Sequence, residues 1–160
     1  VDAFRLVQER MPTARLNIVG DGPQAEELQS LAADLPVTFT GYLSGAALVR
    51  AYEQADIFVF PSTTDTYGKV VLEAQAAGLA VVVSGQGGPR ENVVPGKSGI
   101  VVRQETAEAY ASAMLALASD AHMLLGMKRE ARCYAESRSS EKAFAAQWKL
   151  IETLTPQACW

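Results

Sequence analysis

The chain has 160 residues, of which 49% are hydrophobic and 20% charged, as is ordinary for one soluble globular domain with a buried core. Its net charge of -4 provides no general positive field, so we expect no nucleic-acid partner. No apolar run approaches the roughly 20 residues that cross a bilayer, and no signal peptide is visible, so we expect no transmembrane segment. Cys133 and Cys159 fit no metal or redox spacing, and we interpret them as free thiols in the cytoplasm.

Short apolar segments alternate with helical patterns along most of the chain. The expected strands cover residues 15–20, 37–40, 57–60, 79–83 and 99–102. Several of them are continuously apolar and rich in β-branched residues, which is typical of strands buried on both faces. Between them, residues 24–33 and 44–54 have helical patterns, with Pro23 suited to a first helical position and Ser44 to a cap. The alternation predicts an α/β fold: a Rossmann-like parallel sheet with helices on both faces.

Apolar side chains recur at helical spacing at both ends of the chain. The stripes are Val1, Phe4, Val7 and Met11; Tyr110, Met114 and Leu117; Met123, Met127, Ala131 and Tyr134; and Phe144, Trp148 and Ile151, closed by Pro156. Such stripes predict amphipathic helices that pack on a core, and we assign no cofactor site to them. His122, the sole histidine, lies at the start of the third pattern, and we interpret it as a surface residue.

Two acidic residues, Asp65 and Glu73, frame a stretch in which the expected strand 57–60 leads through a loop into a helix that begins near Gly68. In open α/β sheets ligands bind at the carboxyl ends of the strands, and the N–H groups of a helix N-terminus favour phosphate. Carboxylates accept hydrogen bonds from sugar hydroxyls, so a phosphate between the two acids would suit a nucleoside diphosphate sugar. The alternative is that Asp65 is a turn or cap residue and Glu73 an exposed helix residue.

The segment FVFPSTTDTYGKVVLEAQAAGLAVVVSGQGGPREN resembles the nucleotide-sugar site of glycosyltransferase family 4, a retaining family with the GT-B fold. The mark of that family is an acidic residue, seven others and then Glu, after a strand that ends in Pro-Ser. Pro61, Ser62, Asp65 and Glu73 stand at those positions. The segments LNIVGDGP, VTFTGYL and GGPRENVVPGKSGIVV match the same family in the same order, so the resemblance covers nearly the whole chain.

The resemblance implies a role for each matching residue. Glu73 would bind the ribose hydroxyls, and Asp65 would be the catalytic acid that approaches the donor sugar. The family usually has Glu at the position of Asp65, so the shorter side chain implies an altered donor fit. Gly68, with the backbone of Lys69 and Val70, would cradle the phosphates. The further donor-binding positions that the resemblance implies are Thr66, Tyr67, Gly41, Tyr42 and Gly20. It implies no metal and no cofactor beyond the nucleotide-sugar substrate.

One family segment is missing. Family members hold the diphosphate with an Arg and a Lys that follow the first strand of this domain, and no such segment is present here. We therefore expect residues 1–160 to be the N-terminally truncated C-terminal half of a GT-B fold, without its first strand and without the acceptor domain. Lys69 and Arg90 could replace those cations in part, the alternative being solvated charges. The unfilled sheet centre and the Trp148 stripe also predict self-association.

The resemblance implies two competing functions. In the first, the chain is the donor-binding half of a retaining, metal-independent glycosyltransferase that transfers a hexose to a lipid or glycan acceptor. In the second, it is a non-catalytic fragment that binds nucleotide sugars, and a nucleotide-sugar 2-epimerase-like domain is a third, weaker alternative. We expect the parent protein to be a cytoplasmic enzyme, peripheral at the inner membrane face, and the isolated chain to be inactive.

Overall fold

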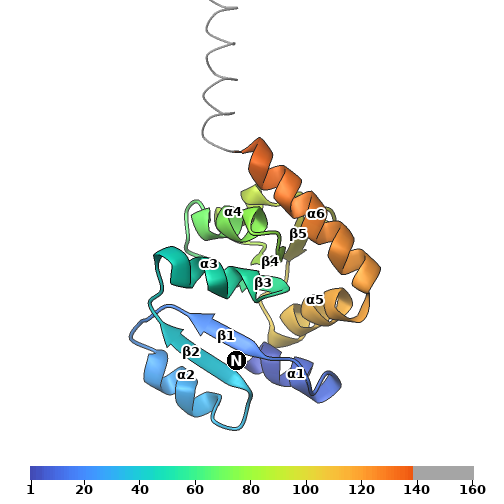
Figure 1. Cartoon of the computed structure of the whole chain (residues 1–160). Coiled ribbons are helices and arrows are strands. Elements are labelled where there is room, and N and C mark those ends of the chain that lie inside the picture. The colour runs from blue at the N-terminus through green and yellow to red at the C-terminus, as the bar shows by residue number, and fades with distance from the viewer. Residues whose placement is uncertain (139–160) are drawn as a thin grey trace, which may run out of the picture.

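The computed structural model describes residues 1–138, and it confirms the expected α/β fold with parallel strands (Figure 1). The strands are β1 (Leu16–Val19), β2 (Val37–Gly41), β3 (Ile57–Phe60), β4 (Ala80–Ser84) and β5 (Gly99–Val102). The helices are α1 (Asp2–Arg10), α2 (Ala25–Leu31), α3 (Gly45–Glu53), α4 (Lys69–Ala76), the short 3-10 helix η1 (Pro89–Asn92), α5 (Ala107–Ser119) and α6 (Ala121–Ser137). The expected helix of Phe144, Trp148 and Ile151, together with Pro156 and Cys159, lies outside the described residues.

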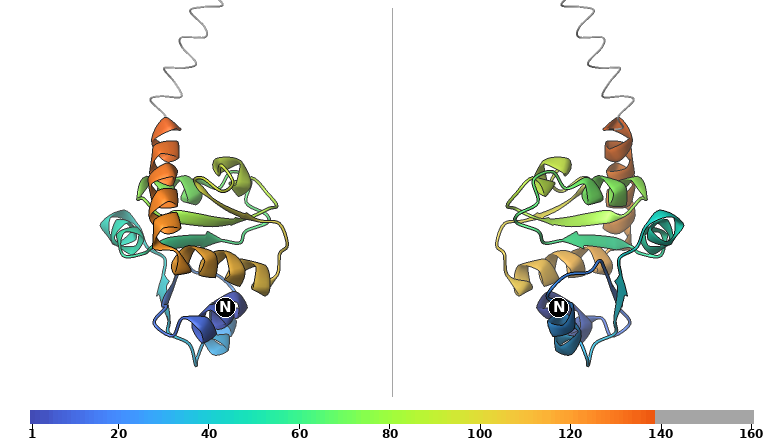
Figure 2. Two further views of the ribbon diagram at one scale, coloured as in Figure 1. Left: turned by 90° about the vertical axis from the view of Figure 1, so that its right-hand side faces the viewer. Right: turned by 90° about the vertical axis from the view of Figure 1, so that its left-hand side faces the viewer.

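The core lies around β4, the middle strand of the three-stranded sheet β3-β4-β5. All residues of β4 are buried, as its continuous apolar run predicts. Val81 and Val83 pack against α4, whereas Val82 faces the opposite way and packs with Leu117 of α5 and Met127 of α6. Figure 2 shows α4 on one side of these strands and α5 on the other. Helices therefore cover both faces of this sheet.

The first two strands form a sheet of their own. β1 pairs only with β2 and β3 only with β4, so among the described strands no hydrogen-bonded ladder joins β1 to β3. The α1 residues Phe4 and Val7 pack with Ala111 of α5 and with the β1–β2 sheet, which ties this sheet to the rest of the molecule. Because one edge of β3 is open, its four apolar residues are half-buried.

Several expected boundaries need correction. Pro23 is not the first helical residue: α2 begins at Ala25, with Gln24 at its N-cap. Ser44 does stand at the N-cap of α3, but its side chain forms no capping hydrogen bond. Capping side chains are found instead on Thr106 and Asp120, which accept from the backbone N–H groups of Ala109 and Met123 at the starts of α5 and α6. Among the described helices, none is both long and apolar enough to cross a membrane.

Candidate functional site

The candidate site lies at the carboxyl edge of the three-stranded sheet, where the loop of residues 61–68 joins β3 to α4. Gly68 is the N-cap of α4 and has left-handed backbone angles, φ 71° and ψ 42°, which favour glycine. A Cβ atom on Gly68 would also stand 2.7 Å from the Cα atom of Pro89. The expectation that α4 begins at this glycine is therefore confirmed, and its first turn directs backbone N–H groups towards the sheet edge.

Asp65 is held inside this loop by hydrogen bonds at both its backbone and its carboxylate. Its Oδ1 accepts from the backbone N–H groups of Tyr67, at 2.9 Å, and of Gly68, at 2.5 Å. Its own N–H donates to Ser62 Oγ at 3.2 Å, and its carbonyl accepts from Gly88 N at 2.9 Å. In this structure Asp65 thus has the turn-forming role that we gave as the alternative. A phosphate on the Gly68 N–H would have to displace this carboxylate.

Glu73 is half-buried in α4, so it is not the exposed helix residue of the alternative interpretation. It lies near Tyr52 of α3, whose pKa is raised first by burial and then by the negative charge of Glu73. The Tyr52 ring packs edge-on against Phe58 of β3, with 5.9 Å between the ring centroids. The place of Tyr52 beside Glu73 depends on how α3 docks, which the spacing alone does not specify.

The loop of residues 85–92 packs directly on the loop that carries Asp65. A Cβ atom on Gly88 would lie 2.0 Å from the carbonyl oxygen of Thr66, and one on Gly87 would lie 3.0 Å from that of Asp65. These glycines therefore permit the close contact between the two loops. Arg90, a candidate donor contact, donates from Nη1 to the Gly85 carbonyl at 2.7 Å. Lys69 is exposed on the first turn of α4.

A buried hydroxyl and a carboxylate fix the end of β4, from which this second loop starts. Ser84 Oγ donates to Glu105 Oε1 at 2.7 Å and accepts from Gln86 N at 2.9 Å. The Tyr110 hydroxyl donates to Glu105 Oε2 at 2.7 Å, and burial, followed by this hydrogen bond, raises the pKa of Tyr110. Sequence reasoning did not identify Glu105, because its partners lie on two other elements.

The remaining candidate residues belong to the other sheet. Gly20 N donates to the Gly41 carbonyl at 2.8 Å, so these two glycines meet at the carboxyl ends of β1 and β2. Tyr42 follows them and is 81% exposed. The structure thus places the candidate residues in two groups, one on each sheet, and both groups lie at carboxyl ends of parallel strands.

Replacing Gly88 by alanine is expected to lower the free energy of unfolding by about 1–3 kcal/mol, the usual cost of overpacking. The reason is that the new Cβ would clash with backbone atoms of Thr66, which cannot rotate away. Denaturant unfolding would measure this loss. Gly126→Ala is the matched control, because a Cβ atom there meets nothing within 4 Å. Equal stability of the two variants would contradict the tight contact between the loops.

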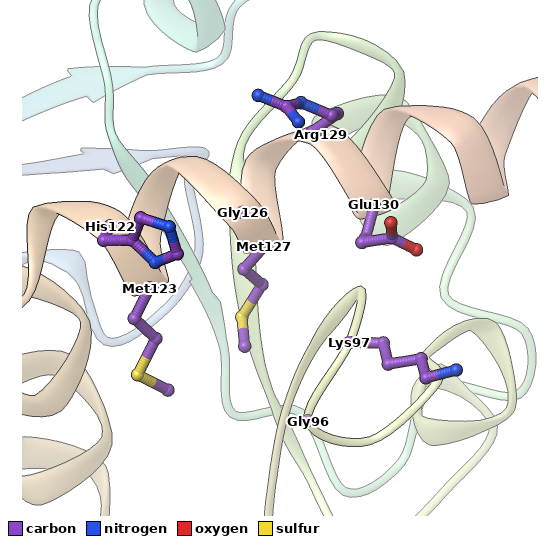
Figure 3. Close-up of a pocket in the computed structure, with 8 residues that line it drawn as sticks. All are labelled: Gly96, Lys97, His122, Met123, Gly126, Met127, Arg129 and Glu130. Atoms are coloured by element: carbon purple, nitrogen blue, oxygen red, sulfur yellow. The ribbon is translucent and has the colours of Figure 1, made fainter.

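A cavity of about 420 Å³ lies elsewhere, between the N-terminal half of α6 and the turn before β5 (Figure 3). Met123 and Met127 point towards this turn, whereas Arg129 points away from it on the other side of the helix. Because its polar side chains do not converge, we assign no ligand to this cavity. Within residues 1–138, no cluster of His, Cys, Asp and Glu has the three members that a metal site would need.

Comparison with known proteins assigns the chain to a family. A family model described as glycosyl transferases group 1 matches residues 1–120. A sulfoquinovosyl transferase of Arabidopsis thaliana is 43% identical over 88 residues, which make up 55% of this chain and 17% of the relative. A GDP-mannose-dependent alpha-(1-6)-phosphatidylinositol monomannoside mannosyltransferase of Mycolicibacterium smegmatis is 35% identical over 131 residues, 75% of this chain and 34% of the relative. The chain thus spans about a sixth to a third of the length of these relatives.

Among solved structures, the C-terminal domain of a group 1 glycosyl transferase from Francisella tularensis matches this chain with a TM-score of 0.75. The identity is 20%, and the match covers 86% of this chain and 75% of that domain. This likeness concerns the fold, and it agrees with the parallel strands and flanking helices described above. Because the family model covers most of the sequence, the chain belongs to the group 1 glycosyl transferases.

Proposed function

We propose that residues 1–160 are the donor-binding domain of a longer, retaining glycosyltransferase that transfers a hexose from a nucleoside diphosphate sugar to a lipid or glycan acceptor. The observation that carries this proposal is the carboxyl-edge loop, which places Asp65 at the start of α4 and Glu73 further along the same helix. The mannosyltransferase relative is named as dependent on GDP-mannose, which supports a nucleotide-sugar donor. The chain spans only part of its relatives, which is consistent with an acceptor domain elsewhere in the parent protein.

We propose roles for the residues of α4 that agree with its geometry and with the family resemblance. The backbone N–H groups of Gly68, Lys69 and Val70, with the positive end of the helix dipole, would stabilise the diphosphate as it departs. Glu73 would accept hydrogen bonds from the ribose hydroxyls. In the proposed reaction, the bond between the anomeric carbon and the diphosphate oxygen breaks, and a bond to the acceptor oxygen forms on the same face. The proton of the acceptor hydroxyl passes to the departing diphosphate. No metal takes part in the proposed reaction.

Asp65 needs to move for this function. Its carboxylate now accepts from the Tyr67 and Gly68 N–H groups. When a diphosphate takes the Gly68 N–H, the released carboxylate would turn towards the donor sugar and stabilise positive charge there. Thr66 and Tyr67 are exposed on the same loop, where they would line the sugar. Lys69 and Arg90 would supply part of the positive charge that the diphosphate requires, and Gly20, Gly41 and Tyr42 would lie near the base.

The second candidate function is a domain that binds nucleotide sugars without catalysis. It is favoured by the engagement of Asp65 with its own loop, because a carboxylate that only holds the loop would leave no catalytic acid. It is also the function we expect of the isolated chain, in which the acceptor cannot be brought to the donor.

For the parent protein we place the reaction in the cytoplasm at the inner membrane face, since the mannosyltransferase relative is named for a phosphatidylinositol acceptor.

The test is calorimetric titration of the chain with GDP, UDP, GMP and UMP. One diphosphate is expected to bind at least about ten-fold more tightly than its monophosphate, because the second phosphate reaches the start of α4. Equal affinity for a diphosphate and its monophosphate would contradict the phosphate cradle at Gly68. Binding of neither would contradict the proposed donor site.

A further inference from the structure

Two buried amide side chains connect α4, η1 and the candidate-site loop. Gln75 in α4 is fully buried, and Asn92 in η1 is 4% exposed. The Asn92 Nδ2 donates to the backbone carbonyl of Tyr67, in the site loop. From the other side, Gln75 Nε2 donates to the Asn92 carbonyl at 3.1 Å. The chain of contacts therefore runs from the middle of α4, through η1, to the residue before Gly68.

The buried Gln75 lowers the stability of the fold, because its Oε1 atom has no hydrogen-bond partner within the part of the chain that the structure describes. Its Nε2 also lies 3.4 Å from Ser98 Oγ, so the amide joins η1 to the turn before β5. An apolar side chain would fill the same space without the unpaired oxygen. A role in holding neighbouring segments gives a physical reason for an amide at this position.

The element that carries Asn92 is itself anchored on several sides. Pro89, at the start of η1, is fully buried and contacts the position of Gly68. The Tyr134 hydroxyl of α6 donates to the Glu91 carbonyl at 3.1 Å. By contrast, the Tyr67 side chain is 62% exposed, so the site loop has little side-chain packing of its own at that point. The loop is held there by hydrogen bonds to its backbone. η1 has more packing and hydrogen-bond contacts of its own than this part of the loop, so η1 can fix the loop in place.

We propose that Asn92 is a positioning residue for the donor site. By holding the Tyr67 carbonyl, it fixes the peptide that leads into Gly68 and hence the direction of the N–H groups at the start of α4. Gln75 acts one step further back by holding η1. Asn92 does not touch the donor in this account. The inference rests on the proposed function, because the orientation of these N–H groups matters for the site only if a phosphate binds there.

The test compares Asn92→Ala with Ser98→Ala. Ser98 belongs to the same buried cluster and is 1% exposed, but it bonds to the turn before β5 and not to the site loop. In Asn92→Ala, hydrogen exchange of the backbone amides of residues 67–69 is expected to become about ten-fold faster, as one restraining hydrogen bond is lost. Binding of whichever diphosphate the wild-type chain prefers, GDP or UDP, is expected to weaken about ten-fold. Ser98→Ala should leave the exchange rates and the diphosphate affinity within two-fold of the wild-type values. This should hold even if its melting temperature falls as far as that of Asn92→Ala.

Equal exchange rates in wild-type and Asn92→Ala chains would overturn the proposal, as would equal acceleration by Ser98→Ala. If Asn92→Ala does not fold, Asn92→Ser repeats the test, since its hydroxyl is too short to reach the Tyr67 carbonyl. The two measurements, hydrogen exchange and diphosphate binding, also separate this inference from the proposed function. Failure of the wild-type chain to bind either diphosphate would defeat the proposed function, while the exchange rates would still decide whether Asn92 holds the loop.

Discussion

Replacing Glu73 by glutamine is expected to weaken binding of the preferred nucleoside diphosphate by about 1.5–3 kcal/mol, the range for a hydrogen bond to a charged group. Glutamine keeps the size of the side chain but replaces one acceptor oxygen by an amide that donates. The ribose hydroxyls would therefore lose a charged acceptor, while the packing of α4 would be preserved. The melting temperature should change little. Calorimetric titration of both chains, with the unfolding transition recorded for each, measures the two effects.

The matched control for this variant is Glu53→Gln. Glu53 is an exposed residue at the end of α3, outside the candidate site, and its replacement removes the same charge. Its affinity for the diphosphate should equal that of the wild-type chain. If instead Glu73→Gln binds the diphosphate normally but loses its fold, then Glu73 is structural and acts through its contact with Tyr52.

Replacing Asp65 by asparagine in the intact enzyme is expected to lower turnover ten-fold or more, a loss of about 1.4 kcal/mol or more of transition-state stabilisation. The asparagine Oδ1 can still accept from the N–H groups of Tyr67 and Gly68, so the loop should keep its shape. Nucleoside diphosphate affinity should therefore stay close to that of the wild-type enzyme. Steady-state kinetics and calorimetric titration of the full-length protein separate these two quantities.

Asp65→Ala separates the charge of Asp65 from its role in the loop. It removes both the negative charge and the acceptor of the two N–H groups, so turnover should fall at least as far as in Asp65→Asn. A purely structural Asp65 would give a different pair of results. Asp65→Asn would then retain full turnover, and only Asp65→Ala would be impaired.

The parts of the site that depend on local pattern could be predicted from the sequence. The strands at residues 57–60 and 99–102 have the expected bounds, because each is a short apolar run between turn residues. The start of α4 at Gly68 was predictable as well, since a glycine precedes a helical apolar pattern. These features position the loop of Asp65 at the carboxyl edge of the sheet.

The contacts that shape the loop could not be predicted in the same way. The bond from Asn92 to the Tyr67 carbonyl joins residues 25 positions apart, and the fit of Gly88 against Thr66 depends on how two loops meet. The periodicity of apolar residues along the sequence predicts neither this hydrogen bond nor this contact. Likewise, Pro23 suits a first helical position, but the turn that follows β1 runs on to Gln24 before α2 begins.

The separation of the strands into two sheets was not predictable from the sequence pattern. The four residues of β3 are continuously apolar, whereas β1 alternates between partly buried and exposed residues, and nothing in either sequence marks an open edge. The resemblance implied that the first strand of the domain is absent, but it did not specify how the remaining strands would pair. The expectation of self-association stays a prediction that light scattering on the isolated chain can test.

A nucleoside diphosphate is expected to bind where the Asp65 loop meets α4. The decisive measurement is titration of the isotopically labelled chain with GDP or UDP, followed by the backbone amide signals in NMR spectra. We expect the largest shifts on residues 66–70 and on Glu73, with the Gly68 amide changing as it exchanges the Asp65 carboxylate for a phosphate. Shifts concentrated on the α6 cavity, at Gly96 and Met127, with Gly68 unchanged, would contradict it.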